Sequence, residues 1–210
     1  MANHTKLKEL MLMKNTADYS KIVQDMILSL SEVGYKTPSE YVKTCWDIYQ
    51  NSVYVQPLID DFILSHILAA LCIKEDIIPV LVRKKPLSGP NVIYDLMFYT
   101  AERGPICWSV KTSLRERYKQ ADLESIALKY VHRKALSYLI TLEKNEAKSV
   151  KAKIKTGDVI GLDEVIVATE PEFDLLVAEL KKYQIEEPPT VQVISSNQVV
   201  TAEKVALLKK

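Results

Sequence analysis

The sequence predicts an α/β fold, more narrowly an α+β arrangement with a roughly five-stranded mixed sheet flanked by helices and a helical N-terminal third. Three observations lead to this expectation. Residues 1–75 carry apolar side chains at helical spacing, residues 77–111 hold short β-like runs separated by turns, and residues 113–182 alternate between helical and strand-like stretches. We therefore expect two regions, 1–75 and 76–210, with the sheet in the second.

The N-terminal region is expected to contain three helices. Apolar residues recur at helical spacing from Ile22 to Leu30, and Gly34 ends that helix. Residues 37–40, Thr-Pro-Ser-Glu, are typical of a second helix start, and a third helix is expected over residues 58–73.

In the second region, a first strand and a loop are expected to precede a β-hairpin around Gly104, and a long crossover helix after the hairpin makes the third and fourth strands parallel. We expect strands over 78–82, 92–100, 106–111, 136–142 and 163–168, helices over 113–131 and 172–182, a loop over 84–90, a charged solvated connection over 144–155, and a last strand (191–194) and helix (202–209).

Composition limits the class of protein. Of 210 residues, 48% are hydrophobic and 26% charged, as in a folded globular domain, and the net charge of +1 does not itself indicate a nucleic-acid partner. The three cysteines form no Cys-x-x-Cys pair, which argues against a zinc site or a disulfide framework and favours a reducing cytoplasm. The start lacks a signal peptide's apolar core, and the longest apolar stretch, residues 62–73, is too short to span a membrane.

Asp95 and Lys111 are the first candidates for chemistry. Asp95 lies in an apolar strand, where a carboxylate is costly unless a cation or hydrogen bonds satisfy it, and Lys111 ends the next strand. A hairpin across Gly104 would bring both to one edge, where a carboxylate can hold a divalent cation and an ammonium can act on a water or a phosphate. The alternative is structural: Asp95 caps a turn or pairs with an arginine, and Lys111 is a surface residue.

The stretch from Ser109 to Glu124 resembles the PD-(D/E)XK nuclease superfamily, and more narrowly type II restriction endonucleases of the EcoRII and SsoII kind. The resemblance covers roughly residues 78–180 and rests on a strand acid, then a lysine on the next strand, then a Lys-x-x-x-x-x-Arg-x-x-Gln pattern that Lys111, Arg117 and Gln120 match. It implies a restriction-endonuclease-like core in residues 76–210, Mg²⁺ as cofactor and double-stranded DNA as partner.

The chain departs from the superfamily pattern at two places. Many members carry an acid two residues before the lysine, where this chain has Ser109, and a proline before the first acid, where it has Tyr94. Some restriction enzymes that share this serine supply the acid from the next helix. The resemblance therefore implies that Glu124 joins Asp95 as a metal ligand, with Asp122 as the second choice.

Glu116 has three interpretations. Ser113 and Glu116 have capping-box spacing, which is the preferred interpretation, and metal ligation is the second. The third is base recognition, because Arg115, Glu116 and Arg117 resemble the segment that reads C·G pairs in related enzymes, which would imply a GG/CC element in the target. A further acid from the start of the sheet sometimes joins the metal site in relatives, and the candidates are Asp60, Asp61 and Glu75.

The expected function is therefore a sequence-specific type II restriction endonuclease that hydrolyses double-stranded DNA with Mg²⁺. We expect it to act in the cytoplasm as a homodimer, with DNA contacts or the dimer surface in residues 1–75. Catalysis is assigned to Asp95, Lys111 and Glu124, and DNA binding to Arg115, Glu116, Arg117 and Gln120. The alternatives are a structure-specific repair or recombination nuclease and a DNA-binding protein of the same fold that does not cut.

Overall fold

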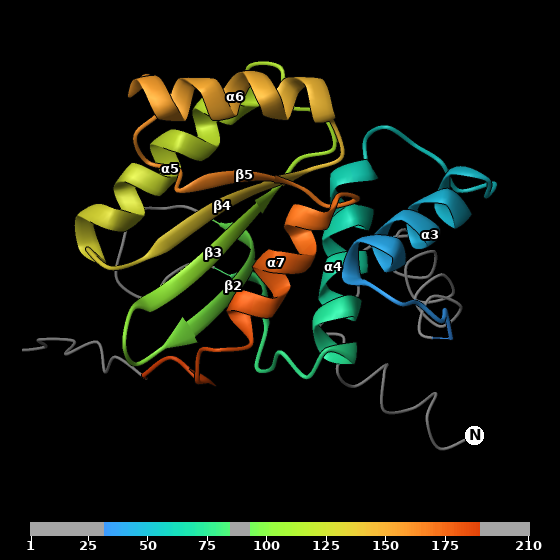
Figure 1. Cartoon of the computed structure of the whole chain (residues 1–210), viewed down its shortest axis with the longest axis horizontal. Helices are drawn as coiled ribbons and strands as arrows, with labels where there is room; N and C mark the ends of the chain where they lie inside the picture. The colour runs from blue at the N-terminus through green and yellow to red at the C-terminus, as the bar shows by residue number, and fades with distance from the viewer. Residues whose placement is uncertain (1–31, 85–92, 190–210) are drawn as a thin grey trace, which may run out of the picture.

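The computed structural model describes residues 32–84 and 93–189, which form a mixed sheet with helices on both faces (Figure 1). This confirms the predicted fold class. The expected elements at residues 22–30, 191–194 and 202–209, and most of the loop at 84–90, lie outside the described residues. The helices are α3 (Pro38–Gln50), α4 (Asp60–Lys74), α5 (Arg117–Val131), α6 (Lys144–Thr156) and α7 (Pro171–Leu180); the strands are β1 (Leu81–Lys84), β2 (Tyr94–Thr100), β3 (Gly104–Val110), β4 (Leu136–Thr141), β5 (Glu164–Val167) and β6 (Ile185–Glu186).

The sheet has the strand order β1-β2-β3-β4-β5, with β6 paired to β2. β1, β2 and β3 are antiparallel, and β2 and β3 form the expected hairpin, in which Thr100 pairs with Gly104. Gly104 has a φ of 78°, a conformation that glycine adopts without a steric cost. β3, β4 and β5 are parallel, and the crossover through α5 predicted the first of these pairs, β3 with β4. The carboxyl ends of these three strands therefore lie along one edge of the sheet.

Two layers of helices cover the sheet. α3, α4 and α7 share one core cluster with strand residues such as Phe98, Trp108 and Ile166. α5 and α6 pack on the opposite face, where Leu114, Ala121 and Val150 meet β4 and β5. The two described helices of the N-terminal region thus belong to the same core as the sheet. α3 begins as predicted, with the Thr37 hydroxyl accepting the backbone N–H of Glu40.

Two sequence predictions were wrong. Residues 144–155, expected as a solvated connection, form helix α6, whose inner face carries Ala147, Val150 and Ile154. The crossover helix begins at Arg117 instead of Ser113, and its N-cap Glu116 makes no side-chain capping bond. The reason is tertiary: the Glu146 carboxylate on α6 accepts the backbone N–H of Leu114 at 2.5 Å, which holds the chain in a turn before the helix starts.

None of the helices in residues 32–84 and 93–189 is long and apolar enough to cross a membrane.

Candidate active site at the end of the hairpin

The side chains of Asp95 and Lys111 meet at the open end of the β2–β3 hairpin. Lys111 Nζ lies 3.5 Å from Asp95 Oδ2 and donates to the carbonyl oxygen of Val110 at 3.1 Å. The two side chains are only 16% and 20% exposed, so their charges are mostly withdrawn from water. An ion pair in such a position persists because each charge offsets the desolvation of the other.

Asp95 also explains where the two strands part. The last β2–β3 pair at this end joins Leu96 to Trp108, and one residue further the Asp95 carboxylate accepts the backbone N–H of Val110 at 2.8 Å. A side chain thus replaces a main-chain acceptor. Tyr94 and Met97 pack in one core cluster while Leu96 packs in the other, so the regular alternation of the strand is broken beside Asp95.

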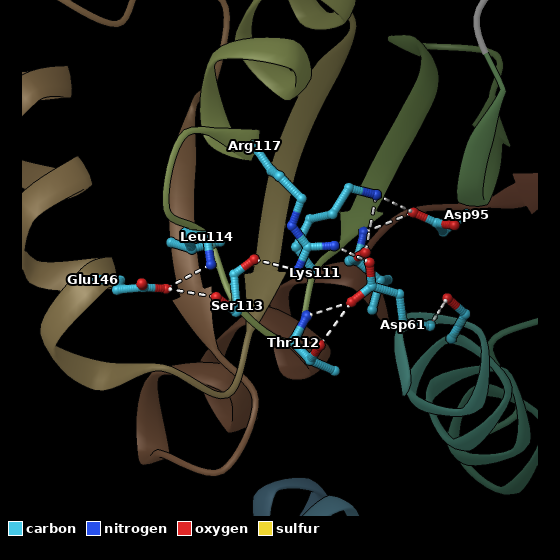
Figure 2. Close-up of polar contacts among 10 residues, drawn as sticks. Asp61, Asp95, Lys111, Thr112, Ser113, Leu114, Arg117 and Glu146 are labelled. Carbon is cyan, nitrogen blue, oxygen red and sulfur yellow. Dashed lines mark hydrogen bonds and ion pairs between the residues drawn. The ribbon is translucent and has the colours of Figure 1, made fainter. Parts of the chain in front are cut away.

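Asp61, from the first turn of α4, completes the cluster (Figure 2). Its Oδ1 accepts the backbone N–H of Thr112 at 2.7 Å and the Thr112 hydroxyl at 2.8 Å. Its Oδ2 accepts from the Arg117 guanidinium at 2.5 Å, and the same guanidinium also donates to the carbonyl oxygen of Ser113. Asp61 and Arg117 therefore clamp the segment that follows Lys111 against α4.

Asp61 was one of three acids that the sequence offered as a further metal ligand, and the other two make structural contacts. Asp60 accepts the hydroxyl of Tyr49 at 2.7 Å. Glu75 accepts from the hydroxyl of Tyr35 and from Lys181. The sequence showed only that Asp61 is an acid at the start of an apolar helix. Asp61 lies 50 residues before Lys111, and no motif spacing connects residues so far apart.

Glu124, the predicted helix acid, is not part of this cluster. Its carboxylate accepts from the Gln120 amide at 2.8 Å, one turn earlier on α5. Its carbonyl oxygen accepts the hydroxyl of Tyr94 at 2.7 Å. Burial raises the pKa of Tyr94, so its hydroxyl stays protonated and joins α5 to the strand next to Asp95.

Asp122 and Ser109 occupy structural positions. Asp122 Oδ1 accepts the backbone N–H groups of Gly161 at 2.6 Å and Leu162 at 3.2 Å, which ties α5 to the segment before β5. Gly161 lies so close that an added Cβ would come within 2.3 Å of the Asp122 carbonyl oxygen. Ser109 is buried in β3, opposite Leu139 of β4. Within the part of the chain that the structure describes, neither side chain makes a hydrogen bond or ion pair with Asp95 or Lys111.

The segment proposed to read bases lies at the surface. Arg115 is exposed and has a φ of 38°, a backbone conformation that non-glycine residues rarely adopt. Glu116 is exposed and pairs with Lys119, whose hydrogen bond and charge hold the pKa of Glu116 below its usual value. Because Glu116 is itself the N-cap of α5 and makes no side-chain capping bond, the predicted capping box is wrong. Glu116 and Arg115 point away from the core. Arg117, in contrast, is engaged with Asp61.

The charged cluster can accept a divalent cation at one position. Within residues 32–84 and 93–189, Asp95 Oδ1 has no hydrogen-bond or ion-pair partner, whereas both oxygens of Asp61 are occupied. No three His, Cys, Asp or Glu side chains gather there around one point. Mg²⁺ commonly binds through one or two carboxylates and keeps water or substrate phosphate as its other ligands, so a single open carboxylate oxygen fits that ion.

Comparison of the chain with protein-family models, with curated proteins and with solved structures gave no match.

Proposed function

We propose that this chain is a Mg²⁺-dependent endonuclease that hydrolyses phosphodiester bonds in double-stranded DNA, and that it cuts at specific sequences. One observation carries the proposal. A carboxylate and an ammonium, Asp95 and Lys111, lie 3.5 Å apart at the end of a hairpin, and one carboxylate oxygen is open. The motif resemblance of residues 109–124 supplies the reaction class.

The residues have distinct roles in this proposal. Asp95 Oδ1 would hold Mg²⁺, and the ion would supply positive charge for the phosphate oxygens and lower the pKa of a bound water. Lys111 Nζ, already hydrogen-bonded to the Val110 carbonyl, donates to the attacking water or to a phosphate oxygen as negative charge develops there. The low exposure of both groups strengthens these interactions relative to water.

Asp61 and Arg117 are positioning residues in this scheme. Together they hold the Thr112–Ser113 segment by contacts to Thr112 and to the Ser113 carbonyl, and that segment directly follows Lys111. Catalysis is sensitive to displacements on the order of 1 Å, so a fixed backbone next to the catalytic lysine matters. Glu124 remains the proposed second metal-binding acid, and Asp122 is the second choice. For Glu124 to take this role, DNA binding would have to break the hydrogen bond between its carboxylate and the Gln120 amide.

The remaining parts of the proposal concern partners. Arg115 and Glu116 are exposed and free of the core, so they have the freedom to reach base edges in the major groove. Symmetric cutting of both strands at a palindrome is most simply achieved by a two-fold dimer, which we include in the proposal together with a cytoplasmic location.

A DNA-binding protein of the same fold that does not cut is the second candidate. It is favoured by the lack of a three-acid cluster among the described residues and by the occupied oxygens of Asp61. The two candidates differ in one measurable property, which is hydrolysis in the presence of a divalent cation.

The test is digestion of plasmid and phage DNA by the purified full chain with Mg²⁺ and with Mn²⁺. We expect discrete fragments from the wild type and a loss of rate of about a hundredfold or more in Lys111→Ala, with DNA affinity and folding retained. Lys134→Ala, at an exposed lysine before β4, is the matched control. Cutting by Lys111→Ala at the wild-type rate contradicts the proposed role. Binding without cutting by the wild type supports the second candidate, and fragments without defined ends indicate a nuclease that is not sequence-specific.

A further inference from the structure

A cavity of about 560 Å³ lies between α6 and the start of α7, next to the end of β5. Four lysines of α6 line it: Lys144, Lys148, Lys151 and Lys155. Their spacings of four, three and four residues place them on one side of the helix. The row covers about 16 Å of helix length, given a rise of about 1.5 Å per residue.

The cavity has an excess of positive charge. Glu170 and Glu172 also line it, and they pair with Lys144 and Lys151 respectively. Glu172 is further fixed because its other oxygen accepts the backbone N–H of Val167 at 2.7 Å. Lys148 and Lys155 are exposed and have no ion-pair partner within residues 32–84 and 93–189. Two of the four lysines therefore remain available to an anionic ligand.

The cavity and the candidate active site lie on the same edge of the sheet. Lys111 follows β3, Lys144 begins the helix after β4, and Glu170 follows β5, and these three strands are parallel. Adjacent strands are about 4.8 Å apart, so β3 and β5 are separated by about 10 Å. Figure 2 shows Glu146 of α6 beside Leu114, and their hydrogen bond at 2.5 Å joins α6 to the segment after Lys111.

We propose that this lysine-lined cavity binds the phosphate backbone of the same DNA strand that enters the Asp95–Lys111 site, an inference that rests on the proposed function. Each strand of duplex DNA has one phosphate per about 3.4 Å of axis, so the lysine row matches about five successive phosphates. Lysine ammonium groups bind phosphate as point charges and read no sequence, so the cavity adds affinity and register without specificity.

The variant Lys148→Gln/Lys155→Gln tests this assignment. Glutamine keeps most of the side-chain length, and neither lysine contributes an ion pair to the described fold. Lys43→Gln/Lys134→Gln is the control, because it removes two positive charges from exposed lysines on α3 and before β4. Any effect of net charge alone will therefore be equal in the two double variants.

The measurement is the affinity of the full chain for a fluorescent DNA duplex without divalent cation, by polarisation at several salt concentrations. We expect the Lys148/Lys155 variant to bind about tenfold more weakly at 0.1 M salt, and its slope of log K against log salt to fall by about 1.8, since each phosphate contact contributes about 0.9. The control variant is expected to retain the wild-type slope. Cleavage of the same duplex with Mg²⁺ is measured in parallel.

The outcomes separate the two proposals. If the wild type cuts and the two double variants have equal affinity and salt slope, the cavity assignment is overturned and the proposed function stands. If the wild type binds without cutting, the nuclease is overturned, and a reduced slope in the Lys148/Lys155 variant alone still supports a backbone site. If the wild type neither binds the duplex nor cuts it with Mg²⁺, both are overturned. Binding of each protein to phosphatidylserine vesicles is measured as well. If the Lys148/Lys155 variant loses affinity for these vesicles while its DNA affinity is unchanged, the assignment of the cavity to DNA is overturned.

Discussion

Substitution of Asp61 tests whether the segment after Lys111 is held from α4. Asp61→Ala removes the acceptor of the Thr112 backbone N–H and hydroxyl, at 2.7 and 2.8 Å, each of which contributes about 1 kcal/mol net. It also removes the ion pair with Arg117, which we discount to about 0.5 kcal/mol because the two side chains are 42% and 29% exposed. The expected loss in the free energy of unfolding is about 2–3 kcal/mol.

Two further variants separate the contributions. Asp61→Asn keeps an oxygen for Thr112 and loses the charge that Arg117 requires, so we expect a loss of only about 1 kcal/mol. Asp60→Ala is the matched control, because Asp60 also lies in the first turn of α4 and accepts a single hydrogen bond, from Tyr49. The helix-dipole contribution of a first-turn carboxylate is thus removed in both alanine variants.

Urea unfolding gives the stabilities, and DNA cleavage at a temperature where all variants are folded gives the activities. We expect both Asp61 variants to lose activity and Asp60→Ala to retain it. If the free energy of unfolding of Asp61→Ala is within about 0.5 kcal/mol of the wild-type value, the proposed role of Asp61 in holding the segment after Lys111 is refuted. Full activity in Asp61→Asn would show that cutting does not require the ion pair between Arg117 and Asp61.

Two other predictions concern pH and the helix acid. Burial alone would raise the pKa of Glu75, but hydrogen bonds from Lys181 and Tyr35 outweigh burial and lower the pKa. The charged carboxylate therefore stabilises the folded state at pH values above the ordinary glutamate pKa of about 4.3, and this stabilisation is lost as the pH falls through the lowered pKa. Glu75→Gln should therefore lower the free energy of unfolding at pH 7. The difference in this free energy from the wild type, measured by chemical denaturation, should shrink below about pH 4, and a difference that does not change with pH would contradict a contribution from the charged carboxylate. Asp122→Ala should lower the melting temperature, because two backbone N–H groups lose their acceptor, whereas Glu124→Ala should leave stability nearly unchanged and reduce cutting. Wild-type cutting by both single variants would remove α5 as the source of the second acid.

The fold and the first part of the site were predictable because they depend on local patterns. Period-two apolar runs on either side of Gly104 specify the hairpin, and a hairpin fixes that Asp95 and Lys111 end at one edge. The helical period after residue 113 specifies a crossover and thus a parallel pair. Neither step required knowledge of distant residues.

The failures come from contacts between segments far apart in the chain. Ser113 and Glu116 have the right spacing for a capping box, but Glu146, 32 residues after Leu114, takes the N–H of Leu114 and delays the helix. Helix α6 was hidden by its lysines, although Ala147, Val150 and Ile154 recur at helical spacing and gave an available signal.

Ser109 decides the charge balance of the site. An acid at this buried position of β3 would add a second carboxylate near Asp95 in the part of the chain that already excludes water, and two such groups repel each other without a cation. With serine there, Asp95 is balanced by Lys111 and Asp61 by Arg117. The folded state therefore needs no cation to neutralise this cluster. In the proposed reaction, Asp95 Oδ1 would be the first protein ligand of Mg²⁺, and Glu124 could join it only after leaving Gln120. Oxygens of the DNA phosphate would supply further ligands, so we expect the ion to bind together with DNA rather than as a structural part of the fold.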